Sequence, residues 1–204
     1  MLTIVKRSSV FFLLLAWLVT VPVLAAEPTI EDMVGGTYYL GCNLHFSPTS
    51  KGRIWADAAM KTPGGEFIPV GSAVRVHMVK SNKRTGKADV VFVLVESGKR
   101  YRYTVGEQVV GVAPALRNIA RVFVADPALV QVRLNGLTEP DRNGVKAGRV
   151  VAGMSREGVL LAIGYPPEFV DPEGMHAACW RYWRDETKIF EVCFDEAGRV
   201  TEVR

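Results

Sequence analysis

The sequence predicts an α+β fold, in which a small β-barrel or roll is followed by a two-layer α/β module. In that module one or two helices pack on a three-stranded antiparallel meander. Short stretches of alternating apolar and polar residues, separated by Gly- and Pro-rich turn signals, fill the region before residue 110. A helix with clear start and stop signals begins after residue 150, and two apolar strands flanking a polar turn follow it.

The first 26 residues have the features of a secretory signal peptide. Two basic residues precede an apolar run, Pro22 interrupts the helix, and the small residues Ala25 and Ala26 suit cleavage. An uncleaved membrane anchor is the alternative, because the apolar stretch is almost long enough to span a bilayer. Glu27 follows the predicted cleavage point where a lipoprotein needs Cys, so we expect an exported chain without a lipid anchor.

The charge balance bears on possible partners. The chain has 25 Lys and Arg residues against 21 Asp and Glu residues. Loss of Lys6 and Arg7 with the signal peptide leaves a net charge of about +2, which gives no reason to expect nucleic acid binding. The length after cleavage fits one or two small domains with enough apolar residues for a core. We predict four segments: a signal peptide at 1–26, a β region at 27–110, a helix and linker at 111–135, and an α/β module at 136–204.

Strand patterns dominate the β region. In "AVRVHMVK", Val74, Val76 and Met78 alternate with polar residues, which predicts a strand with one apolar face. The more continuous apolar run "ADVVFVLVES" predicts a strand covered on both faces, and "KRYRYTV" alternates again. A basic cluster falls in or beside the predicted hairpin loop; we expect a solvated loop, with contact to an anionic lipid or glycan as the alternative. The cluster comprises Lys80, Lys83, Arg84 and Lys87.

A helix is predicted after the β region, because apolar residues in "APALRNIARVFVADP" recur at helical spacing. These residues are Leu116, Ile119, Ala120 and Phe123. Asp126 and Pro127 are expected to end the helix, since proline cannot continue it. The following stretch is interpreted as a link, and the boundary to the second module is placed near Asn135.

The stretch "GMSREGVLLAIGYPP" has the signals of a capped helix. Ser155 is a suitable N-cap, because its hydroxyl can accept from an unpaired backbone N–H of the first turn. Met154 and Val159 have the spacing of a hydrophobic staple. Gly164 can take the backbone conformation that ends a helix, and the two prolines after it forbid continuation.

A hairpin follows, and its register predicts a disulfide. If the chain turns through residues 185–187, Cys179 lies opposite Cys193 on the adjacent strand, at a Cα separation that a disulfide tolerates. An exported protein reaches an oxidising compartment, so we expect this bond to form and Cys42 to stay outside it. Two reduced, buried cysteines are the alternative. The same register puts four apolar residues on one face for the core: Trp180, Tyr182, Phe190 and Val192.

The C-terminal segments resemble the small outer-membrane-assembly lipoproteins of the SmpA/OmlA (BamE-like) family. The resemblance covers about Glu139 to Arg204 and rests on "GMSREGVLLAIGYPP", "WRYW" and "FEVCFDEAGRVTEV", while "DRNGVKAGRVVAGM" is similar to the first helix of that fold. It implies a two-layer α/β fold packed for protein contact, with a binding role and no catalysis. The sequence departs from the family in lacking the acylated N-terminal Cys and in having Gly158 where Glu or Gln would complete a capping box. In the β region, "FIPVGSAVRV" resembles SH3-like barrels.

Residues suited to catalysis or metal binding are few. His45, His77 and His176 are the histidines, and His77 is expected to be solvated on the polar face of its strand. The pairs Cys42-x-x-His45 and His176-x-x-Cys179 together supply four potential zinc ligands. We disfavour zinc, because residues three apart on a strand point to opposite faces. No metal or cofactor is therefore predicted.

We expect a non-catalytic protein, periplasmic or secreted, that acts by protein-protein or cell-envelope contacts and is linked to outer-membrane assembly or maintenance. A protein partner in the envelope is expected, and nucleic acid is not. Two alternatives remain open. One is a small-ligand-binding protein or enzyme with a site between the two modules, using Cys42, His45 and the aromatic run at Trp180, Tyr182 and Trp183; the other is a secreted enzyme-inhibitor module.

Overall fold

The computed structural model describes residues 30–48, 54–57, 66–82, 87–105, 112–166, 174–184 and 188–204. The predicted signal peptide lies outside these residues, as do Lys83 and Arg84 of the basic cluster. The described part of the chain is α+β, with four α-helices beside open sheets. None of these helices is long and apolar enough to cross a membrane.

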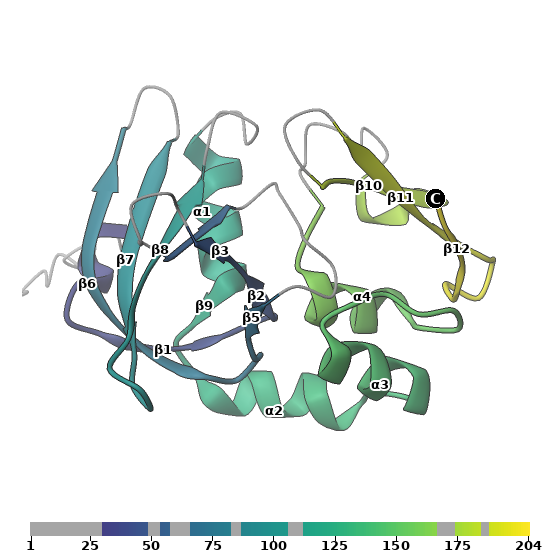
Figure 1. Cartoon of the computed structure of the whole chain (residues 1–204), viewed down its shortest axis with the longest axis horizontal. Helices are drawn as coiled ribbons and strands as arrows, with labels where there is room; N and C mark the ends of the chain where they lie inside the picture. The colour runs from purple at the N-terminus through teal and green to yellow at the C-terminus, as the bar shows by residue number, and fades with distance from the viewer. Residues whose placement is uncertain are drawn as a thin grey trace, which may run out of the picture.

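A seven-stranded sheet with the order β3-β4-β8-β7-β6-β1-β9 forms the left half of the molecule (Figure 1). Its neighbouring strands are antiparallel, except for the parallel pair β4 and β8. The strands are β1 (Thr37–Leu40), β3 (Ser47–Pro48), β4 (Ile54–Asp57), β6 (Ala73–Ser81), β7 (Ala88–Leu94), β8 (Arg100–Val105) and β9 (Phe123–Val124). A separate two-stranded sheet contains β2 (Leu44–His45) and β5 (Phe67–Ile68), and a 3-10 helix, η1 (Ile30–Met33), precedes β1. The described sheets do not close, so the expectation of a barrel is corrected to an open sheet; the SH3-like resemblance stays a prediction.

Strand β6 follows the predicted alternation only at its start. Val74 and Val76 are buried at 0% and 1% exposure, but Met78 is 37% exposed. The register with β7 shifts between Val76 and Met78, because His77 is an extra residue that forms a β-bulge. The bulge moves Met78 off the core face and brings Val79 onto the core in its place.

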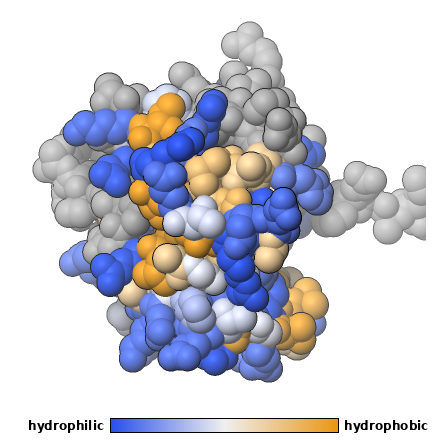
Figure 2. Space-filling view, turned by 90° about the vertical axis from the view of Figure 1, so that its right-hand side faces the viewer, coloured by the Kyte–Doolittle hydropathy of each residue, from blue (hydrophilic) through white to orange (hydrophobic). Residues whose placement is uncertain are grey.

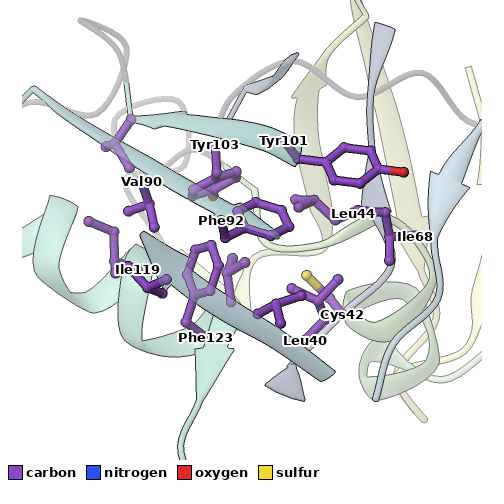
Figure 3. Close-up of a cluster of buried hydrophobic side chains, with 14 of the residues drawn as sticks. Leu40, Cys42, Leu44, Ile68, Val90, Phe92, Tyr101, Tyr103, Ile119 and Phe123 are labelled. Atoms are coloured by element: carbon purple, nitrogen blue, oxygen red, sulfur yellow. The ribbon is translucent and has the colours of Figure 1, made fainter. Parts of the chain in front are cut away.

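The first hydrophobic core lies between the large sheet and helix α1 (Val112–Val122). On β8 the predicted alternation is confirmed, since Tyr101, Tyr103 and Val105 are buried. The middle of β7 is covered on both faces, as its apolar run predicted. Figure 3 shows that strand side chains from β7 and β8 meet those of α1 and β9 in this core.

The segment after α1 differs from the predicted helix and link. Helix α1 ends at Val122, and Phe123 pairs with Leu40 of β1 as part of β9. Asp126 then caps a new helix, α2 (Pro127–Asn135), by accepting from the backbone N–H of Ala128. Proline suits the first turn of a helix, so the Asp-Pro pair that was expected to end a helix begins one instead.

The C-terminal module has two layers. Helices α3 (Glu139–Ala147) and α4 (Arg156–Ile163) pack on a three-stranded sheet of β10 (Cys179–Trp183), β11 (Ile189–Phe194) and β12 (Val200–Val203), and η2 (Gly174–His176) precedes β10. Both strand pairs are antiparallel, which confirms the predicted meander. A second core joins these layers. Figure 2 shows the face at the right-hand side of Figure 1. Hydrophilic side chains cover much of this face, with hydrophobic areas between them.

The helix predicted to begin after Ser155 is confirmed. The Ser155 hydroxyl accepts from the N–H of Gly158 at 3.0 Å, and Met154 and Val159 are both fully buried in the second core. Gly164 ends the helix with a φ of 81°.

Candidate functional site

Buried polar side chains join the large sheet to the C-terminal module. Asn43 and His45 lie on the segment that runs from β1 through β2, and they are 2% and 6% exposed. Cys42, on the same segment, points into the first core beside Leu40, Leu44 and Ile68 (Figure 3). This segment therefore lies between the two hydrophobic cores. We call its contact with the C-terminal module the junction.

Asn43 ties the junction to two helix ends. Its Nδ2 donates to the carbonyl of Val145 at 2.7 Å and of Ala162 at 3.3 Å, and its own N–H donates to the carbonyl of Leu161. These carbonyls belong to the last turns of α3 and α4, where helical N–H donors run out, although the Val145 carbonyl also accepts from the N–H of Gly148 at 3.2 Å. The Asn43 Oδ1 accepts from the N–H of Val70, so both ends of the amide are used.

His45 adds a second polar contact to the end of α4. Its Nε2 lies 3.0 Å from the carbonyl oxygen of Ala162. A carbonyl only accepts, so this geometry requires a proton on Nε2, and that nitrogen cannot act as a general base while the contact persists. The His45 ring also packs at a centroid distance of 5.3 Å from the ring of Phe67 on β5.

Arg133 of α2 connects three parts of the fold at the rim of the junction. Its Nε donates to Glu157 of α4 at 2.6 Å, its Nη1 to the carbonyl of Gly41 at 2.9 Å, and its Nη2 to the hydroxyl of Tyr165 at 3.3 Å. Burial alone would lower the pKa of Arg133, but the hydrogen bond to Glu157 and the charge of that carboxylate help to raise it. Arg133 therefore stays charged as a fixed cation.

Tyr165 lies beside Arg133 at the rim of the junction. The guanidinium of Arg121 on α1 lies over its ring, 4.7 Å from the centroid. Burial is the main cause that raises the pKa of the Tyr165 hydroxyl, and the opposing field of Arg133 does not cancel it. The hydroxyl therefore stays protonated at neutral pH. The rim cluster consists of Arg121, Arg133, Glu157 and Tyr165.

Asp141 is the most buried carboxylate described, at 1% exposure, and it serves two helices. Its Oδ2 accepts from the N–H and the hydroxyl of Thr138, which forms the capping box of α3. Its Oδ1 accepts from the N–H of Ser155 at 2.6 Å, and Oδ2 from the Ser155 hydroxyl at 3.0 Å. Burial alone would raise the pKa of Asp141, but the bonds from Thr138 and Ser155 outweigh it and lower the pKa.

Gly158 now has a physical explanation. At this position Glu or Gln would accept from the N-cap N–H of α4, and Asp141 of α3 accepts from it instead. A Cβ on Gly158 would lie 2.1 Å from the Asp141 Oδ1, so only glycine leaves room for that carboxylate. Asp141 thus supplies the capping carboxylate that residue 158 does not provide.

The predicted disulfide between Cys179 and Cys193 is present. The two Cα atoms are 4.0 Å apart, and the cysteines lie directly opposite each other on β10 and β11. The predicted core face is also confirmed, because Trp180, Tyr182, Phe190 and Val192 are all at most 3% exposed. Cys42 is a buried thiol outside the disulfide.

The opposite face of this hairpin carries an ion cluster. Glu191 accepts from the Arg181 Nε at 2.8 Å and from the Arg204 Nε at 3.0 Å. These hydrogen bonds, first that of Arg181 and then that of Arg204, lower the pKa of Glu191. Trp183 of the predicted aromatic run is half-buried on this face, away from its two buried neighbours.

The potential zinc ligands do not gather. Within the described ranges no group of three or more His, Cys, Asp and Glu side chains is placed to hold a metal ion. Cys179 is in the disulfide, His45 contacts Ala162, and His176 is exposed on η2. His77 is exposed at the bulge of β6, in line with the prediction of a solvated side chain.

Three residues of the junction, its rim and the helix caps were not predicted from the sequence. Asp141 had a readable signal, since Thr138 and Asp141 have capping-box spacing before a helix. Asn43 and Arg133 had none, because their partners are carbonyls and side chains far along the chain. No protein family, curated protein or solved structure matches the chain.

Proposed function

We propose that the chain is a non-catalytic exported protein that acts by protein-protein or cell-envelope contacts, in outer-membrane assembly or maintenance. The observation that carries the proposal is the use of its chemically versatile side chains. His45 contacts a helix end, Asp141 caps two helices, and two of the three cysteines form a disulfide. Such contacts stabilise the fold, and they occupy the Nε2 atom of His45, both oxygens of Asp141 and the sulfurs of Cys179 and Cys193.

The layout of the C-terminal module gives further support. Two capped helices on a three-stranded antiparallel meander are what the SmpA/OmlA resemblance implies, and that resemblance implies a binding role. The disulfide is compatible with a periplasmic or secreted location, where such bonds persist. The SmpA/OmlA assignment itself remains part of the proposal.

A small-ligand site between the modules is the second candidate, and the rim cluster is the observation that favours it. Arg133 and Glu157 have side-chain exposures of 24% and 44%, and the protonated Tyr165 hydroxyl lies within reach of Arg133. A small number of convergent polar groups is typical of small-ligand sites. Against this candidate, Arg133 already uses three donors within the chain.

Affinity capture from envelope extract tests the proposal. The exported chain is immobilised in its native, oxidised form, and the same chain, reduced and denatured, is the matched control. We expect one or more envelope proteins bound by the native chain alone, and no substrate turnover. Turnover of a small molecule without any bound protein would overturn the proposal, and loss of that turnover in Tyr165→Phe would support the second candidate.

A further inference from the structure

One face of the large sheet is rich in exposed cations. On β7 and β8 alternate side chains enter the first core, and on β6 the bulge at His77 makes Val74, Val76 and Val79 the residues that do so. The side chains between them form what we call the outer face. Register places these outer residues in rows across the three strands. Arg75 and Arg100 both pair with Val93, and Lys80 pairs with Asp89.

The cations of the outer face exceed its anions. Asp89 is the acidic side chain that β6, β7 and β8 contribute to this face, and it is used by Arg102 at 3.8 Å and by the Thr104 hydroxyl at 2.6 Å. In the part of the chain that the structure describes, Arg75, Lys80 and Arg100 have no ion-pair partner, and all three are exposed. An excess of positive charge therefore faces solvent.

The same imbalance appears in the composition. Residues 37–105 contain 11 Lys and Arg residues against four Asp and Glu residues, whereas the whole chain has 25 against 21. The positive charge is thus concentrated in the β region, and the remainder of the chain is slightly acidic. A charge asymmetry of this kind indicates a surface that attracts an anionic partner.

The shape of the outer face selects the kind of partner. Small ligands bind in concave sites that enclose them, and a sheet face with cations spread over neighbouring strands offers no such enclosure. Between the cations lie apolar side chains, among them Met78, which is 37% exposed. Cations interspersed with apolar groups match an anionic membrane surface, where headgroup phosphates lie beside apolar chains.

We propose that the outer face docks on anionic lipid headgroups, with Arg75, Lys80 and Arg100 as the principal phosphate contacts. This inference deepens the proposed function by naming one envelope contact, and it rests on the export of the chain. An acidic protein face is the competing partner, and the experiment separates the two.

Vesicle co-sedimentation of the exported full chain provides the test. Vesicles of zwitterionic phosphatidylcholine are compared with vesicles that also contain phosphatidylglycerol, at low and high salt. The test variant is Arg75→Gln, Lys80→Gln, Arg100→Gln. The matched control removes three exposed charges from the other module: Lys146→Gln, Arg149→Gln, Lys188→Gln.

We expect binding to the anionic vesicles alone, weakening as salt rises, because this contact is screened electrostatically. Each basic residue near an anionic surface contributes roughly a factor of five, so the test variant should bind on the order of 100-fold more weakly and the control nearly as wild type. Equal losses in both variants would overturn the proposal. Capture of acidic envelope proteins without vesicle binding would refute the lipid contact and leave the proposed function standing.

Discussion

Asp141 shows how one buried carboxylate can fix the relative positions of two helices. Its two oxygens receive four hydrogen bonds from Thr138 and Ser155, one residue at the start of each helix. A carboxylate at helix N-termini also interacts favourably with both helix dipoles. The residue therefore stabilises the pairing of α3 and α4 as well as each helix.

Replacing this group should cost substantial stability. We expect Asp141→Asn to lower the free energy of unfolding by about 2–3 kcal/mol, because the partly buried backbone N–H groups of Thr138 and Ser155 lose a charged acceptor. Ser155→Ala should cost about 1 kcal/mol through the lost N-cap. Denaturant midpoints measure both changes, and an Asp141→Asn midpoint equal to wild type would contradict the capping role.

Gly158 gives an independent test of the same contact. We expect Gly158→Ala to destabilise the chain by about 1–3 kcal/mol, although alanine normally favours helices, because the new Cβ displaces the Asp141 carboxylate. In the Asp141→Ala background the same substitution should cost much less. Thermal denaturation of the four chains forms a double-mutant cycle, and purely additive effects would argue against the contact.

The lowered pKa of Asp141 predicts a pH dependence. Its contribution is fully present above the unfolded pKa of about 3.9 and is lost as pH falls through the lower folded pKa. The stability gap between wild type and Asp141→Asn should therefore be largest at neutral pH and shrink below about pH 4. Glu191→Gln removes another carboxyl with a lowered pKa, and its stability is measured over the same pH range for comparison. A gap that is constant from pH 7 to pH 2 would contradict the account.

At the scale of elements, the disulfide fixes the register of the C-terminal hairpin. It closes a loop of roughly 15 residues, so reduction or the Cys179→Ala, Cys193→Ala double variant should cost about 3 kcal/mol. Cys42→Ala is the control, because that thiol is outside the disulfide. Non-reducing peptide mapping of the exported chain should recover Cys179 linked to Cys193. A link from Cys42 to either residue would contradict the register.

The elements that the sequence predicted best are those whose signals are local. Caps, turns and two-residue alternation depend on neighbours along the chain, so the helix after Ser155 and the hairpin register were predicted correctly. The β-bulge at His77 and the short strand at Phe123 depend on distant partners. Phe123 continued the helical spacing of α1, and its pairing with Leu40 overrode that local signal.

At the scale of the whole molecule, the junction makes the two cores part of one structure. The amide of Asn43 contacts Val70 on one side and the ends of α3 and α4 on the other. None of these contacts could be predicted from the sequence, since the partners are backbone groups more than 100 residues from Asn43 on the helix side. The junction is therefore the part of the site that only the three-dimensional structure defines.

Removing this amide should uncouple the two cores. We expect Asn43→Ala to lower the free energy of unfolding by about 2–4 kcal/mol and to change one cooperative transition into two, because several buried backbone groups lose their partner. Hydrogen exchange measures protection separately in β7 and in α4. Equal loss of protection in both elements, in a single transition, would mean that other contacts hold the junction.

The central proposal is that the polar groups of the junction and of the rim cluster serve the fold and not catalysis. The most direct measurement is quantitative affinity capture from envelope extract by wild type and by the variant Cys42→Ala, His45→Gln, Tyr165→Phe. This variant removes a thiol, an imidazole and a phenol, while glutamine keeps a donor for the Ala162 carbonyl. The account predicts a folded variant that recovers the same envelope partners in the same amounts. A folded variant that no longer recovers them, or that loses a catalytic turnover present in wild type, would contradict it.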